Sequence, residues 1–566
     1  MELPDRFVFR SLRSSCFMLR WIGWVGFAGL IAAQEPSTFR VNTRLVQVDV
    51  VVRSKDHAVT GLTKTDFRIL DNGKPQSIAT FSVRSNGSNL KATPVPPEII
   101  SNRVTSRGEE PVAATVILFD RLNTAVEDQA YFGKELLKYL KTLQPREHVA
   151  LYSLLKTLRI LEDFTDDPQR LIQAASRAKA QQSVSLASSD ESALKADVST
   201  ITKLADPNNP AEVAAMSLTA EMATNAITEM EDAEKKNRAL ITSRALEDIA
   251  RHLRGLPGRK KLIWVSGSFP VGALEVNSRH YDEFGAETAR AVNALNNADV
   301  AVYAIDPRGL VAFGTNPTGA MQNPVTPQSM MAQIPRPDPV GLNAPNIAAM
   351  NLFASGTGGR AIYATNDLVG AMKAVMEDDE VIYSLGFYPS EQKMDGSYHS
   401  LSVKVARKGS EVHHRQGYLA ADTKVYTPRQ RRDAMTEAVQ NPLDSTELGL
   451  QASTTPISGR PGIYALAVTL SVNELHLEHQ KDRWVGTIDF GTHYSLALDF
   501  RGTFETIRIS LTEERLRETL RDGFTMRREI DPSGSSGELR IVVQDRSTGS
   551  IGSVRVPIGS EQKPAP

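Results

Sequence analysis

Apolar and polar residues alternate with a period of two in the N-terminal part of the chain. Valine occupies every second position over residues 46–52, and further apolar stripes flank the sequence Asp71-Asn72-Gly73. A period of two is typical of a half-buried β-strand, and Asn-Gly favours the turn of a β-hairpin. The pattern therefore predicts a small β module over residues 38–85, followed by a polar linker that ends near residue 111.

Short, continuously apolar segments follow this module and alternate with segments of helical periodicity. Such an alternation is typical of a parallel sheet that is covered by helices on both faces. The sequence therefore predicts an α/β fold over residues 112–420, with a doubly wound, Rossmann-like sheet. Its predicted strands are 113–119, 148–154, 261–267, 299–306, 360–365 and 380–389, with 398–407 as an added edge strand and helices at 129–143, 281–297 and 367–378.

Two insertions interrupt the predicted α/β domain, and a second β region follows it. Residues 172–253 are rich in alanine, glutamate and lysine, which favour a helical insertion. Residues 311–347 are rich in proline, asparagine, glutamine and glycine, which predicts a long loop. Over residues 455–560 the period of two returns, with one helical segment at 512–523, and this pattern predicts a C-terminal antiparallel β-sandwich.

The first 33 residues have the pattern of a secretory signal. Four arginines precede the apolar run from Trp21 to Ala33, which ends in small residues. This run has 13 residues, whereas a helix that spans a bilayer needs about 20. We therefore expect a signal peptide at 1–33 and a secreted or periplasmic chain, with membrane contact only if the segment stays uncleaved. The single cysteine, Cys16, lies within this segment, so the exported chain would have no disulfide.

Length, charge and motifs exclude several classes of protein. A chain of 566 residues is too long for one hydrophobic core, so several domains are expected. Lysine and arginine number 65 against 66 acidic residues, and this balance supplies no positive field that would gather nucleic acid. The sequence contains no Gly-x-x-x-x-Gly-Lys-Ser/Thr loop, no His-Glu-x-x-His helix and no Gly-x-Ser-x-Gly elbow. We expect neither enzymatic activity nor a nucleic-acid partner.

Several phrases of the sequence occur in an order that is typical of one family. They are VDVVV to IATF (48–81), ILFDRLNT (117–124), LEDFTDDPQRL (161–171), GLPGRKKLIWVSGSFP (255–270), VAVYAIDPRGL (300–310), TGGRAIYATNDL (357–368) and YSLGFYPSEQKMDGSYHSLSVKV (383–405). Through these phrases, about residues 40–420 resemble a von Willebrand factor A-type domain, and more closely the VWFA-related family of acidobacterial type. The resemblance implies a doubly wound sheet whose carboxyl edge can hold a divalent cation, the metal-ion-dependent adhesion site.

The chain departs from the cation-binding pattern of that family. In the family, a strand-ending Asp-x-Ser-x-Ser loop and a distant threonine and aspartate supply oxygen ligands to the cation. Asp120 and Thr124 keep the carboxylate and the second hydroxyl, but Leu122 replaces the first serine. The distant aspartate is missing from Ser266-Gly267-Ser268, and Thr242 is the candidate for the distant threonine. The site is therefore expected to be degenerate, and Mg²⁺ is the one cofactor that the resemblance leaves open.

The expected function is that of an exported protein-binding or adhesion-type module, which recognises a protein or cell-surface ligand at the carboxyl edge of its sheet without an obligatory metal. The expected ligand-binding residues are Asp120, Asn123, Thr124, Ser266 and Ser268, and the residual metal ligands are Asp120 and Thr124. A purely local role for Asp120, capping the turn after its strand, is the competing interpretation. The alternative functions are an envelope scaffold, a carbohydrate-binding accessory of a hydrolase, or a purely structural envelope component. The sequence does not define the oligomeric state.

Overall fold

The chain divides into two units, Met1–Thr43 and Arg44–Pro566. The computed structural model describes residues 46–54, 57–85, 90–91, 99–103, 109–110, 114–144, 148–182, 208–256, 258–267, 269, 281–310, 344–377, 381–389, 395–421, 427–495, 500–532 and 537–558. All of these lie in the second unit. The predicted signal segment, Ser268 and residues 311–343 of the predicted loop lie outside the described residues.

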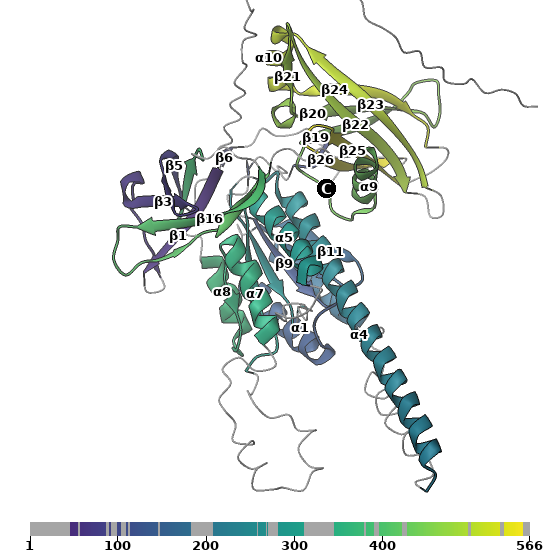
Figure 1. The fold of residues 1–566 in the computed structure, drawn as a ribbon. Coiled ribbons are helices and arrows are strands. Elements are labelled where there is room, and N and C mark those ends of the chain that lie inside the picture. Colours follow the sequence, from purple (N-terminus) through teal and green to yellow (C-terminus); the bar gives the residue numbers. More distant parts are fainter. Residues whose placement is uncertain are drawn as a thin grey trace, which may run out of the picture. The chain divides into compact units, whose positions relative to one another are not determined.

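A six-stranded sheet lies at the centre of the mixed α/β fold, in the order β11-β10-β9-β12-β13-β14 (Figure 1). Neighbouring strands are parallel, except that β11 returns antiparallel to β10. The strands are β9 (Ala114–Asp120), β10 (His148–Leu154), β11 (Leu158–Thr165), β12 (Lys260–Val265), β13 (Val300–Ile305) and β14 (Ala361–Ile362). Five of the predicted strands are therefore present, whereas β11 was not predicted.

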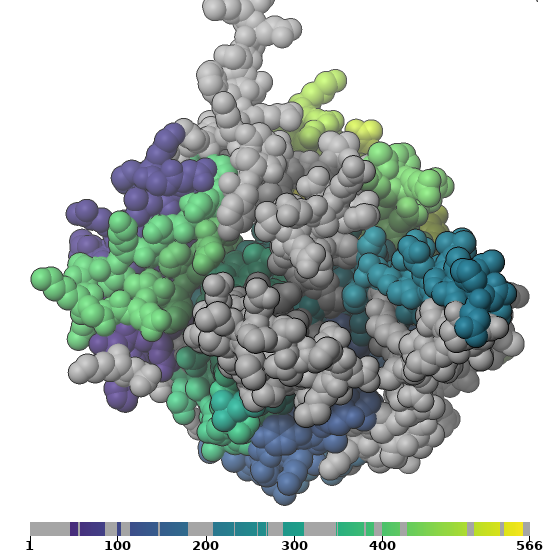
Figure 2. Space-filling model, turned by 60° about the horizontal axis from the view of Figure 1, so that its bottom comes forward, coloured from purple at the N-terminus to yellow at the C-terminus, as the bar shows by residue number. Residues whose placement is uncertain are grey.

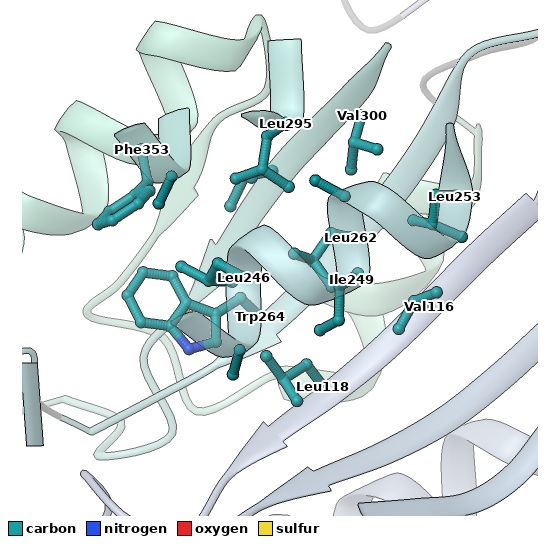
Figure 3. Close-up of a cluster of buried hydrophobic side chains, with 14 of the residues drawn as sticks. Val116, Leu118, Leu246, Ile249, Leu253, Leu262, Trp264, Leu295, Val300 and Phe353 are labelled. Carbon is teal, nitrogen blue, oxygen red and sulfur yellow. The ribbon is translucent and has the colours of Figure 1, made fainter. Parts of the chain in front are cut away.

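Helices pack on both faces of this sheet, because alternate residues of each strand are apolar on either side. Val116 and Leu118 belong to the core with α4, α5 and α7, and Ile117 and Phe119 belong to the core with α1, α2 and α8. The first core surrounds Trp264, whose ring packs edge-on against the Phe353 ring, with 5.3 Å between the ring centroids (Figure 3). The helices are α1 (Val126–Leu140), α2 (Pro168–Gln182), α4 (Pro210–Leu253), α5 (Tyr281–Asn297), α7 (Ala344–Thr357) and α8 (Leu368–Glu377).

The predicted helical insertion contains α4, a helix of 44 residues. Its C-terminal part packs into the core through Leu246, Ile249 and Leu253. Its first 27 residues, over 210–236, contain no buried side chain among those described. No helix in the described part of the chain is long and apolar enough to cross a membrane.

Two predicted strands belong to a different part of the fold. Residues 380–389 were expected to extend the parallel sheet, but β15 (Val381–Phe387) pairs antiparallel with β1 (Val46–Ser54) and β5 (Ile78–Ser85). Residues 398–407 were expected at the edge of that sheet, but β16 (Asp395–Val405) pairs with β3 (Phe67–Asp71). Both predictions are wrong. Continuous apolarity shows that a strand is buried on both faces, but it does not specify the partner strand or its direction.

The N-terminal strands therefore share their sheets with strands from the far side of the α/β segment. Figure 2 shows the purple and green residues of these two segments on one continuous surface. Val48 and Val50 pack there with Tyr383 and Leu385 in one core. The remaining strands in this region are β2 (His57–Ala58), β4 (Lys74–Gln76), β17 (Glu411–His413) and β18 (Gly417–Ala421). A separate two-stranded pair is formed by β6 (Leu90–Lys91) and β8 (Glu109–Glu110).

The C-terminal region contains two antiparallel sheets that contribute to one apolar core. One has the order β24-β20-β19-β7, and the other has the order β21-β22-β25-β26 with β23 paired to β22. The strands are β7 (Ile100–Ser101), β19 (Leu450–Pro456), β20 (Tyr464–Leu470), β21 (Glu478–Gln480), β22 (Arg483–Ser495), β23 (Phe500–Leu511), β24 (Phe524–Ile530), β25 (Gly537–Asp545) and β26 (Ile551–Ile558). The helices of this region are α9 (Pro428–Gln440) and α10 (Glu513–Asp522).

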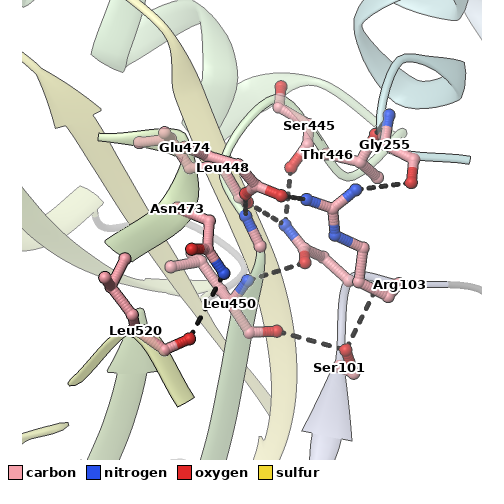
Figure 4. A network of polar contacts seen from close by, with 12 residues as sticks. Ser101, Arg103, Gly255, Ser445, Thr446, Leu448, Leu450, Asn473, Glu474 and Leu520 are labelled. Carbon is pink, nitrogen blue, oxygen red and sulfur yellow. Dashed lines mark hydrogen bonds and ion pairs between the residues drawn. The ribbon is translucent and has the colours of Figure 1, made fainter. Parts of the chain in front are cut away.

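Residues of the predicted linker fasten this region to the end of α4. The Asn102 amide donates to the carbonyl oxygens of Ser445 and Leu448, each at 2.8 Å. The Arg103 guanidinium donates to the Gly255 carbonyl oxygen and to the Glu474 carboxylate (Figure 4). The linker is therefore part of the folded structure at these positions, whereas the sequence predicted only a polar connection.

Truncation of Trp264 tests the central core. Trp264 is fully buried, and a Trp→Ala change at such a position costs about 3–5 kcal/mol. Native-state hydrogen exchange should show the free energy of opening at β9 and β12 amides lowered by about this amount in Trp264→Ala. Tyr388→Ala removes a 49% exposed ring and serves as the control, with unchanged exchange expected in these strands. Equal protection in the two variants would contradict this packing.

Candidate functional site

The predicted site residues lie where two central strands end. Asp120 is the last residue of β9, and Ser266 follows β12, the neighbouring strand. Asn123 and Thr124 lie in the loop between β9 and α1. All four residues are buried, and the Asp120 side chain is fully excluded from solvent. The structure thus brings these four predicted residues together, and Ser268 lies outside the described residues.

Four hydrogen-bond donors surround the Asp120 carboxylate. Oδ1 accepts from the backbone N–H of Asn123 at 3.1 Å. Oδ2 accepts from the Asn123 side-chain amide at 2.9 Å, from Trp264 Nε1 at 3.2 Å and from Ser266 Oγ at 3.0 Å. Hydrogen bonds to a carboxylate compensate for the water that it loses on burial. Asp120 therefore fixes the turn after β9 and connects it to β12.

The Asn123 amide nitrogen lies between two groups that the family resemblance assigned to a cation. Besides Asp120 Oδ2, it donates to Thr242 Oγ1 at 2.8 Å. Thr242 is fully buried on α4 and itself donates to the Arg238 carbonyl oxygen at 2.9 Å. The structure therefore places Thr242 beside Asp120, although 122 residues separate them in the sequence. A neutral amide connects the two.

The Thr124 hydroxyl also has hydrogen-bond partners, and both are backbone groups. Its hydroxyl donates to the Asp120 carbonyl oxygen at 2.5 Å and accepts from the Gly267 N–H at 3.0 Å. Leu122, in place of the first serine, packs against the apolar core. The loop is thus held by its own hydrogen bonds and by one apolar contact.

These residues do not fit a divalent cation. Mg²⁺ needs oxygen ligands with free lone pairs and usually one or two carboxylates. Both oxygens of Asp120 already accept from N–H or O–H groups, and the Thr124 hydroxyl is also bonded. Within the described ranges, no group of three or more histidine, cysteine, aspartate or glutamate side chains has a metal-binding arrangement.

Burial dominates the electrostatics of this site. It raises the pKa of Asp120 from 3.8 to about 6, because the charged carboxylate loses its hydration. The hydrogen bonds from Asn123, Ser266 and Trp264 oppose this shift and hold the pKa below neutrality. Asp120 is therefore mainly ionised at pH 7, but at a cost to stability.

A cluster that the sequence analysis missed lies further along the same edge of the sheet. Tyr131, Leu310 and Tyr363 are 36%, 67% and 41% exposed. Leu310 follows β13 and Tyr363 directly follows β14, so both lie beyond the carboxyl ends of parallel strands. We call these three residues, with Arg308 and Asn366, the edge cluster. The sequence did not indicate an exposed position for Tyr363, because this residue lies within the predicted strand 360–365.

Hydrogen bonds fix the edge cluster in place. Asn366 accepts from Tyr131 Oη at 2.8 Å through its carbonyl oxygen, and from the Leu310 N–H at 2.9 Å through Oδ1. Gly309, with φ of +73°, allows this approach, because a Cβ there would lie 2.3 Å from Asn366 Oδ1.

A charged group is fixed in the same cluster. The Arg308 guanidinium donates to both oxygens of the buried Asp306, with Nε 2.9 Å from Oδ1 and Nη2 2.7 Å from Oδ2. A two-point pair of this kind holds the planar guanidinium in one orientation. The edge cluster therefore combines exposed apolar and aromatic side chains with a guanidinium that is paired with Asp306.

Comparisons with known proteins give no close relative. No protein-family profile and no curated protein matches the chain. A solved von Willebrand factor type A structure from Catenulispora acidiphila is similar over 85% of this chain and 73% of its own, with 8% identity and a TM-score of 0.24. An aerotolerance-related membrane protein from Bacteroides fragilis is similar over 48% of this chain and 99% of its own, with 10% identity and a TM-score of 0.23.

A variant of the PilB minor pilin from Streptococcus sanguinis gives a similar result, over 48% of this chain and 61% of its own, with 9% identity and a TM-score of 0.23. Likenesses with TM-scores this low carry no argument about this chain. Its family and function are therefore inferred below from its own residues.

The raised pKa of Asp120 predicts a pH-dependent effect of Asp120→Asn. A carboxyl group whose pKa is higher in the folded state than in the unfolded state lowers stability as pH rises from about 4 to 6, and this loss remains above pH 6. Between pH 4 and pH 7, the difference in unfolding free energy should shift by about 2 kcal/mol in favour of Asp120→Asn. Urea unfolding of both proteins across this range measures the shift. Asp482→Asn, on an exposed turn, controls for the loss of one carboxylate. The prediction would be refuted if the unfolding free energies of Asp120→Asn and the parent protein changed with pH by the same amount.

Proposed function

We propose that this chain is an exported, non-enzymatic binding module of the VWFA-related type. The edge cluster would recognise a protein or cell-surface ligand, without a metal ion. The observation that carries the proposal is the exposure of Tyr131, Leu310 and Tyr363 at the carboxyl end of a parallel sheet, where Asn366 fixes Tyr131 and Leu310. Ligands of open α/β sheets bind outside the carboxyl ends of the strands.

The chemistry of the edge cluster favours a macromolecular ligand. Tyrosine and arginine are enriched among the residues that contribute most to protein–protein affinity. Rigid side chains lose little conformational entropy on binding, and Tyr131 and Arg308 are both tied to the scaffold. Asp120, the carboxylate that the sequence analysis placed at the centre of the site, is fully buried and supports the loop instead of facing a ligand.

The finer classification of the fold belongs to the same proposal. We infer that the central sheet with helices on both faces is a doubly wound, Rossmann-like sheet of the von Willebrand A type. Its support is the strand order together with the ordered phrases of the sequence. The two C-terminal sheets that share one core support the interpretation of this region as a β-sandwich. Export through the signal at 1–33 completes the proposal.

Site-specific photocrosslinking in the producing organism tests the binding edge. A benzophenone amino acid in place of Tyr363 should give an ultraviolet-dependent adduct with a defined envelope or surface molecule. Addition of Leu310→Asp should reduce the adduct at least about tenfold, because a buried unpaired charge would oppose the contact. The same probe at Tyr388, which is 49% exposed and directly follows β15, is the matched control. Absence of an adduct at position 363, or equal adducts at both positions, would sink the proposed edge.

Calorimetric titration tests the metal-free clause separately. Mg²⁺, Mn²⁺ and Ca²⁺ should give no saturable heat with the purified chain, because the oxygens of Asp120 and Thr124 already accept hydrogen bonds. The Asp120→Ala variant should behave in the same way. Micromolar binding that Asp120→Ala abolishes would show that the loop opens to a cation, and the metal-free mechanism would then be wrong.

A further inference from the structure

A basic, apolar groove lies on the β region that contains the N-terminal strands. Its volume is about 500 Å³, which lies within the range of about 300–1,000 Å³ that is typical of ligand sites. We call it the basic groove; its lining includes Lys64, Arg68, Leu70, Pro75, Ile78 and Lys404. It is separate from the carboxyl edge of the central sheet.

The charges of the basic groove are not compensated locally. Arg68 on β3 lies directly opposite Lys404 on β16 in the strand register. Across the described ranges, Lys64, Arg68 and Lys404 form no ion pair. Like charges directly opposite each other on neighbouring strands lower stability. An anionic group in the groove would relieve this repulsion, so the groove favours an acidic partner.

A partner would contact the apolar part of the groove through its side chains and would not add a strand to the edge of the sheet. The edge strand β4 has three residues and includes Pro75, which lacks an N–H group. Short edge strands with proline are poor templates for the addition of another strand. A partner would instead insert apolar side chains against Leu70, Pro75 and Ile78. The expected partner therefore combines carboxylates with exposed apolar groups on one face.

One exposed face of α4 has this composition. Leu218, Glu221, Met222, Asn225 and Glu229 follow the spacing of one helical face and are all exposed. Leu218 and Met222 are 54% and 63% exposed. We call these five residues the acidic face. Residues 210–234 contain six acidic side chains and no lysine or arginine.

Among the described residues, the negative charges of the acidic face are not neutralised by neighbouring side chains either. In the part of α4 that the structure describes, Glu221 and Glu229 form no ion pair. Helices in proteins gain most of their stability from the packing of an apolar stripe, and Leu218 and Met222 remain exposed here. The acidic face and the basic groove thus have opposite charge, and each exposes apolar surface.

We propose that the basic groove of one copy of this chain receives the acidic face of α4 from a second copy. Leu218 and Met222 pack against Leu70 and Ile78, while Glu221 and Glu229 neutralise Arg68 and Lys404. Because two different surfaces meet, the contact is heterologous, and repetition produces a ring or an open chain of copies. Electrostatic attraction makes the association sensitive to salt.

Sedimentation velocity on the purified chain tests the proposal through an exchange of charges. The chain should self-associate as its concentration rises and should dissociate when salt is raised from about 0.05 M to 0.5 M. Arg68→Glu with Lys404→Glu, or Glu221→Lys with Glu229→Lys, should each weaken association at least about tenfold. An equimolar mixture of the two double variants should recover association, because an acidic groove then meets a basic helix.

Control variants separate this contact from a general effect of charge or folding. Arg429→Glu with Arg432→Glu, on exposed positions of α9, should leave association unchanged. Arg68→Gln with Lys404→Gln should weaken association even if the reversed variant fails to fold, as judged by circular dichroism. A monomer at every concentration, association that survives both reversals, or a mixture that does not recover would each overturn the proposal.

Discussion

The charge of Asp120 is buried where β9 ends, and the arrangement of the neighbouring loops follows from this constraint. A buried carboxylate needs hydrogen-bond donors from the protein in place of water. Here Asn123, Trp264 and Ser266 provide them. Asn123 belongs to the β9–α1 loop, whereas Trp264 and Ser266 lie together at the end of β12. Satisfying one anion therefore fixes the β9–α1 loop against the end of β12. Through the Asn123 amide, it also connects that loop to Thr242 on α4.

This solution has a cost that a metal ion would not impose. A cation would neutralise Asp120, whereas neutral donors leave its charge in a poorly hydrated site and its pKa raised to about 6. In return, the loop needs no ion to keep its shape. Thr124 and Gly267 close the loop with hydrogen bonds of their own. The loop is thus preorganised by its own hydrogen bonds, and the proposed metal-free binding edge would benefit from a rigid scaffold of this kind.

The sequence predicted the central strands because continuous apolar runs such as 114–120 and 300–305 can only be buried on both faces. It misassigned 381–387 for the same reason, since that strand is equally apolar but pairs antiparallel with β1. Asp120, Thr124 and Ser266 were found through the family resemblance. The role of Asn123 as the connecting donor was not, because it depends on Thr242, which α4 brings close only in the folded chain.

The edge cluster shows a different limit of sequence analysis. Tyr363 lies within the predicted strand 360–365 and Leu310 lies after the predicted strand 299–306, and only the folded structure shows that both are exposed beyond the last paired residues. The positions of Leu310 and Arg308 depend on polar residues with no distinctive motif: Asn366 holds Leu310, and Asp306 holds Arg308. In the proposed function, a polar residue that orients an exposed apolar neighbour would contribute to binding without touching the ligand. Since such pairs are defined by distances in space, composition and periodicity alone do not reveal them, and the proposed binding edge rests on the structure.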